Sequence, residues 1–146
     1  MDKYEYKVRS EEISNLIEEE KYAEAVSIAD TIDWRRVKSA TMLLKIAALY
    51  RANKRNEDSR EILMLAYDRY PTNRSIVRFL CELSIELDDV VAAIEYCKQF
   101  ARLAPRDSTV YILRYRILEA QEASLEERIQ ILEELKKRDY QEEWIY

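Results

Sequence analysis

The stretches LAYDRYP (Leu65–Pro71) and QFARLAP (Gln99–Pro105) indicate how this chain is built. Each ends in one of the chain's two prolines, and these prolines lie 34 residues apart. Residues upstream keep the same spacing, so that Ala47 precedes Cys81 by 34 residues and both stand on apolar stripes. A fixed period of this length is the sign of repeated two-helix units, which bury their apolar faces against one another.

Within one period the apolar pattern is that of helices. In SATMLLKIAALYRAN (Ser39–Asn53) apolar residues recur at positions i, i+3, i+4 and i+7, which is one face of a helix. The chain has no glycine, which argues against many sharp turns or bulges. We expect helices over residues 4–19, 22–32, 39–52, 56–70, 73–87, 90–103, 108–120 and 124–138, with another beginning near 141.

Several predicted helices are preceded by polar residues suited to cap them. The candidate N-caps are Thr72 or Asn73, Asp88 or Asp89, and Asp107 or Ser108. The run SLEE (Ser124–Glu127) has the spacing of a capping box. These residues support the predicted helix starts independently of the apolar pattern.

The helix pairs resemble tetratricopeptide repeats (TPR), whose 34-residue units have apolar, small and aromatic residues at set columns and a closing proline. The resemblance is carried by Leu43–Pro71, by Val77–Pro105 and by KYAEAVSIAD (Lys21–Asp30), and it covers essentially the whole chain. It implies an all-α fold, a right-handed superhelical array of antiparallel helix pairs forming an α-solenoid. The repeats would span about 4–38, 39–71, 72–105 and 106–139 in a single domain, with residues 140–146 beginning a further repeat that is truncated.

Two features depart from the family's pattern. Arg114 stands where the fourth unit would normally have an apolar residue. The turn between the two helices of a unit usually carries a glycine in the family, and this column holds Glu20, Lys54, Asp88 and Glu122. If these residues adopt positive φ, each costs about 1 kcal/mol relative to glycine.

A TPR array would expose the first helix of each unit on a concave face. The residues of its free stripe, our candidate peptide-binding groove, are Leu44, Ala48, Arg51, Arg78, Glu82, Ile85, Ile112 and Arg116. The three arginines could clamp a carboxylate or an acidic peptide. The alternative is that they form solvated surface or ordinary ion pairs between repeats.

The stretch ADTIDWRRVKS (Ala29–Ser39) is expected to join the first two units. Val37 lies one period before Pro71, so this joint lacks the closing proline. Trp34 is expected to pack between the helix pairs, whereas Arg35 and Arg36 are candidates for the edge of a binding surface. The segment DTIDWRRVK also resembles uncharacterised TPR proteins of low-GC Gram-positive bacteria.

Composition excludes several classes of function. The chain has no histidine, and Cys81 and Cys97 belong to no CxxC pair, so we expect reduced core thiols, no metal and no cofactor. No nucleophile stands beside a base, which predicts a protein that is not an enzyme. A net charge of −5 disfavours nucleic acid, and no apolar run is long enough to span a membrane.

We therefore expect a non-enzymatic interaction module or scaffold that binds an unknown protein or peptide segment in its groove. The alternative is a scaffold that self-associates, as a homodimer, through Trp144, Ile145 and Tyr146 at its apolar C-terminal end. The charged N-terminus and the lone cysteines favour a cytoplasmic setting, and a membrane anchor in another part of a longer protein stays open.

Overall fold

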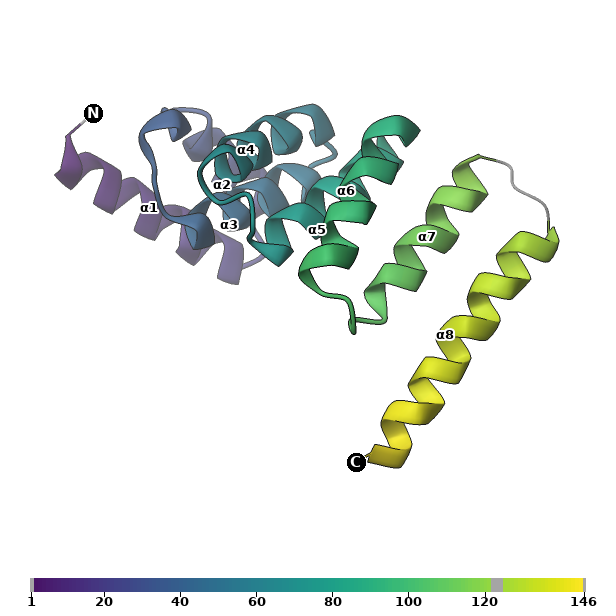
Figure 1. The fold of residues 1–146 in the computed structure, drawn as a ribbon. Helices are drawn as coiled ribbons and strands as arrows, with labels where there is room; N and C mark the ends of the chain where they lie inside the picture. Colours follow the sequence, from purple (N-terminus) through teal and green to yellow (C-terminus); the bar gives the residue numbers. More distant parts are fainter. Residues whose placement is uncertain (1, 122–124, 146) are drawn as a thin grey trace. The chain divides into compact units, whose positions relative to one another are not determined.

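The computed structural model describes residues 2–121 and 125–145, with side chains up to Arg138. Its described secondary structure is entirely helical, as predicted (Figure 1). The helices are α1 (Lys3–Glu18), α2 (Tyr22–Ala29), a 3₁₀ turn η1 (Trp34–Arg36), α3 (Ala40–Ala52), α4 (Asn56–Arg69), α5 (Arg74–Glu86), α6 (Val90–Leu103), α7 (Thr109–Ala120) and α8 (Leu125–Ile145).

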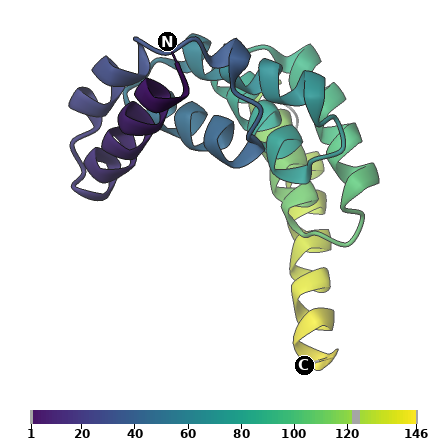
Figure 2. The same ribbon diagram turned by 90° about the vertical axis from the view of Figure 1, so that its left-hand side faces the viewer.

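The chain divides into two compact units, one ending at Pro71 and the other beginning at Thr72. In unit 1, α1 packs on α2, α3 packs on α4, and α2 contacts α3. Both views of the ribbon place α1 beside α2 (Figures 1 and 2). In unit 2, α5 packs on α6 and α7 on α8, while α7 also contacts α5 and α6. Each unit therefore consists of two packed helix pairs, and the boundary follows the proline that closes the second predicted repeat.

The turn inside each of the first three pairs has a left-handed residue, at the column where tetratricopeptide repeats usually carry a glycine. Glu20, Lys54 and Asp88 have φ values of 60°, 61° and 59°; Glu122 lies outside the described residues. The residue after each one donates its N–H to a carbonyl five positions back, with N···O distances of 2.8 Å from Lys21 to Leu16, 2.9 Å from Arg55 to Tyr50 and 2.8 Å from Asp89 to Ser84. These are Schellman motifs, and the backbone thus repeats with the period of the sequence.

The helix pairs meet along the predicted apolar faces, where the close contacts repeat as well. Ala47 on α3 and Cys81 on α5 are completely buried. The Ser59 hydroxyl on α4 donates to the Ala47 carbonyl over 2.6 Å, and the Cys81 thiol donates to the carbonyl of Ala93 on α6 over 3.3 Å. Both contacts join residues 12 positions apart. Small residues at these columns let the two helices of a pair approach closely.

The predicted N-caps that fall in the described residues are confirmed in part. Asn73 accepts from the N–H of Ile76 and Asp89 from that of Ala92, each over 3.2 Å. Asp107, rather than Ser108, binds the start of α7, accepting from the N–H of Thr109 over 2.9 Å. The predicted capping residue Ser124 lies outside the described residues.

Two helix boundaries differ from the prediction. Helix α2 ends at Ala29 rather than near residue 32, because the Ala29 carbonyl accepts from the Trp34 indole and from the N–H of Ile32 instead of continuing the helical ladder. Helix α8 continues to Ile145 without the break expected near residue 140. The segment KKRDYQEE (Lys136–Glu143) contains neither glycine nor proline, so nothing in it stops a helix.

Candidate functional site

The first joint, residues 30–39, is organised around Trp34. This side chain is buried, and its Nε1 donates to the Ala29 carbonyl over 3.0 Å. The ring of Tyr6 from α1 meets the indole edge-on, with ring centres 6.5 Å apart and planes at 78°. Burial of the large ring with its N–H satisfied agrees with the expected packing role of Trp34.

The end of α4 holds the backbone of the joint in place. The Arg69 guanidinium donates to the carbonyls of Val37 and Arg35, the latter over 2.6 Å. The Tyr70 hydroxyl donates to the Lys38 carbonyl over 2.5 Å. The joint is therefore a fixed piece of unit 1, although its only regular structure is a short 3₁₀ turn.

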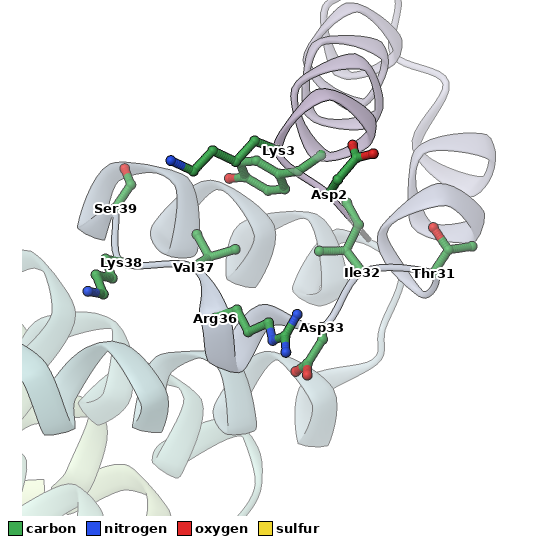
Figure 3. Close-up of a pocket in the computed structure, with 10 residues that line it drawn as sticks. Asp2, Lys3, Thr31, Ile32, Asp33, Arg36, Val37, Lys38 and Ser39 are labelled. Atoms are coloured by element: carbon green, nitrogen blue, oxygen red, sulfur yellow. The ribbon is translucent and has the colours of Figure 1, made fainter.

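A cavity of about 670 Å³ lies between this joint and the start of α1 (Figure 3). Its lining residues are Asp2, Lys3, Tyr6, Thr31, Ile32, Asp33, Arg36, Val37, Lys38 and Ser39. Ile32 and Val37 are almost completely buried and form apolar walls together with the half-buried ring of Tyr6. The volume is within the range of pockets that hold small molecules or single large side chains.

The charges around this cavity are unequally compensated. Asp2 is the N-cap of α1 and accepts from the N–H of Glu5 over 2.8 Å. Asp33 and Arg35 form a bidentate ion pair, in which Arg35 Nε and Nη2 donate to the two carboxylate oxygens over 2.9 and 3.1 Å. These hydrogen bonds lower the pKa of the Asp33 carboxyl. The lining cations are Lys3, Arg36 and Lys38, which are all exposed, and the charge of Arg36 also helps to lower the pKa of Asp33. The charge left available to a ligand is thus positive.

The two hydroxyls in the lining already have structural roles. Thr31 donates to the Ile28 carbonyl over 2.6 Å and accepts from Arg9 over 2.9 Å. Ser39 accepts from the N–H of Met42, which caps α3. Apolar walls beside exposed cations can bind an anionic group that carries an apolar neighbour, as in an acidic peptide with an aromatic residue.

The predicted surface edge lies partly at this site. Arg35 and Arg36 are both exposed; Arg36 lines the cavity, whereas Arg35 is bound to Asp33. The sequence did not single out Lys3, Tyr6 or Lys38 as a group. The only signal in the sequence was an excess of positive charge from Asp33 to Arg78, with 11 Lys or Arg against 5 Asp or Glu. Lys3 and Tyr6 lie outside that stretch and reach the joint through the packing of α1 on α2.

The eight groove residues are divided between the two units. Leu44, Ala48 and Arg51 lie on α3 in unit 1, and the other five lie on α5 and α7 in unit 2. Arg78 is within 3.9 Å of Glu82, one turn further along α5, so these two residues form an ion pair. A groove that includes all eight stays a prediction. The proposed self-association residues Trp144 and Ile145 have side chains outside the described ones, and Tyr146 lies entirely outside.

Comparison with known proteins assigns no family to this chain. No protein-family model matches the sequence, and no curated protein matches it. Within the described residues, no helix combines the length and the apolar character needed to cross a membrane. In the same part of the chain, no three Cys, Asp or Glu side chains are grouped as ligands for a metal ion.

Proposed function

We propose that this protein is a non-enzymatic interaction module built from TPR-like helix pairs, and that it binds an acidic segment of another protein. The cavity at the first joint carries this proposal, because it places three exposed cations beside apolar walls. The recurrence of the Schellman turns every 34 residues supports the TPR-like part of the proposal.

The proposed ligand follows from the chemistry of the cavity. An aromatic or large aliphatic side chain would enter between Ile32, Val37 and Tyr6. Carboxylates on either side of it would meet Lys3, Arg36 and Lys38, whose attraction for an anion weakens as salt screens it. The chain from Asp33 to Arg78 carries 11 Lys or Arg against 5 Asp or Glu, which would also favour an acidic partner during encounter.

A direct binding measurement tests the proposal. The probe is a dye-labelled peptide with one aromatic residue flanked by acidic residues, and its control has the corresponding amides. We expect fluorescence anisotropy to show binding of the acidic peptide but not of its amide control, with an affinity that falls as the salt concentration rises. Replacing Lys3, Arg36 and Lys38 together by alanine should weaken binding by about tenfold or more, since each exposed pair contributes up to ~1 kcal/mol.

The matched control removes the same number of positive charges from the predicted groove, through the triple variant Arg51→Ala, Arg78→Ala, Arg116→Ala. Unchanged binding by this variant would assign the peptide to the cavity. If the groove variant loses binding and the cavity variant does not, the protein is still an interaction module, but its binding site is the predicted groove and not the cavity. If the wild-type protein binds the acidic peptide and its amide control equally, the proposal of an acidic partner is wrong.

A further inference from the structure

A second cavity, of about 310 Å³, lies in unit 2 beside a cysteine and an arginine. It is lined by Cys97 of α6 and Arg114 of α7, among apolar side chains such as Ile94 and Ile117. Arg114 is the residue that departs from the apolar column of the fourth repeat. The arginine at this column therefore lines the same cavity as the Cys97 thiol.

The other cysteine lies against the same turn of α6. Cys81 and Cys97 are free thiols, both buried. The Cys81 thiol approaches the Ala93 carbonyl to 3.3 Å, and Ala93 is one helical turn before Cys97. The neighbouring Cys81 thiol and the Arg114 guanidinium lower the pKa of Cys97, against the opposing effect of burial. The same pairing, together with burial, raises the pKa of Cys81.

We propose that Cys97 is a site of oxidation by a small peroxide, and that Cys81 then captures it in a disulfide between α5 and α6. The cavity is large enough to admit such a molecule, since a water molecule occupies about 30 Å³ in the liquid. The two thiols differ in access, because Cys97 lines the cavity whereas Cys81 has no exposed surface. Reactivity of a thiol follows its thiolate character and its access, and both favour Cys97 as the first to react.

The reaction balances in two steps. The Cys97 thiolate attacks one peroxide oxygen, an S–O bond forms, the O–O bond breaks, and the other oxygen leaves as hydroxide that takes up a proton. Cys97 is then a sulfenic acid, oxidised by two electrons. The Cys81 sulfur, losing its proton, attacks the Cys97 sulfur, the S–S bond forms, and the sulfenic oxygen leaves as a second water. Two thiols and one hydrogen peroxide thus give one disulfide and two waters.

Mass spectrometry after treatment with hydrogen peroxide tests this assignment. We expect the full-length wild-type chain to lose both free thiols together and to become lighter by two hydrogens, with one cross-linked peptide joining Cys81 to Cys97. In Cys81→Ser, Cys97 should accumulate as a sulfenic acid that dimedone traps. In Cys97→Ser, Cys81 should react at least tenfold more slowly than Cys97 does in Cys81→Ser.

The role of the arginine is measured with Arg114→Leu, which restores an apolar residue to its column. We expect oxidation of Cys97 to slow severalfold, whereas Arg106→Leu, at an exposed position with the same loss of charge, should leave the rate unchanged. Circular dichroism of each variant shows whether its helices are intact. Equal reactivity of the two cysteines, or disulfides that form only between chains, would overturn the proposal, and the wild-type peptide map decides this even if a serine variant fails to fold.

Discussion

At the scale of single residues, the Trp34 indole fills the first joint and also satisfies the carbonyl at the end of α2. We predict that Trp34→Ala lowers the free energy of unfolding by about 3–5 kcal/mol, the range for removal of a large buried aromatic side chain. Trp34→Phe keeps most of the packing and loses the indole hydrogen bond, so it should cost less. Urea unfolding followed by circular dichroism measures both, and a near-neutral Trp34→Ala would contradict the packing role of this residue.

Asp30 connects α2 to the second helix pair. Its carboxylate accepts from the Tyr50 hydroxyl over 2.8 Å and from the Arg55 guanidinium over 2.7 Å. The Arg55 guanidinium also lies 4.7 Å from the centre of the Tyr50 ring and pairs with Asp58 over 2.8 Å. Hydrogen bonding from Arg55, and then from Tyr50, lowers the pKa of Asp30 despite its partial burial.

This lowered pKa predicts a dependence of stability on pH. A carboxyl whose pKa is lower in the folded chain stabilises the fold above its ordinary pKa of about 4, and this contribution is lost as the pH falls through the lowered value. Asp30→Asn should therefore cost about 1 kcal/mol at pH 7, a modest figure because the pair is partly exposed. Below about pH 4 the difference from wild type should shrink. Asp68→Asn, exposed on α4, is the control; equal pH profiles for Asp30→Asn and wild type would contradict the prediction.

At the scale of elements, the three left-handed turns carry a conformational cost at residues with a Cβ atom. Lys54 has a φ of 61°, so Lys54→Gly should relieve about 1 kcal/mol of it. A glycine also gives the unfolded chain more freedom, which offsets about 0.4–1 kcal/mol. We expect a small net rise in melting temperature for Lys54→Gly and a clearer one for Lys54→Asn, because asparagine tolerates this conformation without that offset. Lys54→Ala should leave the melting temperature nearly unchanged. A fall in melting temperature for Lys54→Gly and for Lys54→Asn would contradict the prediction.

Local sequence signals were sufficient for most of the elements. The caps Asn73 and Asp89 depend on residues within one turn, so they could be read from spacing and residue type, whereas the turn column was implied by the resemblance to tetratricopeptide repeats. The end of α2 could not be predicted from such local signals, because it depends on the hydrogen bond from the Trp34 side chain to the Ala29 carbonyl. The predicted break in α8 relied on the repeat register alone, and no helix-breaking residue supports it.

At the scale of the whole molecule, the proposed module predicts a chain that stays monomeric without its partner. A net charge of −5 opposes association of identical copies. We expect light scattering to give the mass of one chain at every concentration tested. A mass that rises with concentration, and returns to that of one chain in a Trp144→Ala, Ile145→Ala variant, would instead support the self-associating scaffold.

Charge and composition could not locate the cavity at the first joint. Arg36 and Lys38 stand out in the sequence as part of a positive stretch, yet Asp2, Lys3 and Tyr6 are about thirty residues away from them. They reach the joint only because α1 packs on α2 and Tyr6 meets Trp34 edge-on. The pairing of charges also had to be seen in the structure, where the ion pair of Asp33 is formed with Arg35.

The environment of Trp34 also has a spectroscopic consequence. The chain has two tryptophans, so Trp144→Phe leaves a single indole emitter, which is buried and hydrogen-bonded inside unit 1. Its emission should be blue-shifted in the native chain and move to longer wavelength only when water reaches the first joint. Circular dichroism sums the helices of both units, so comparing the two signals during denaturation would reveal whether unit 1 opens before, with or after the rest of the chain.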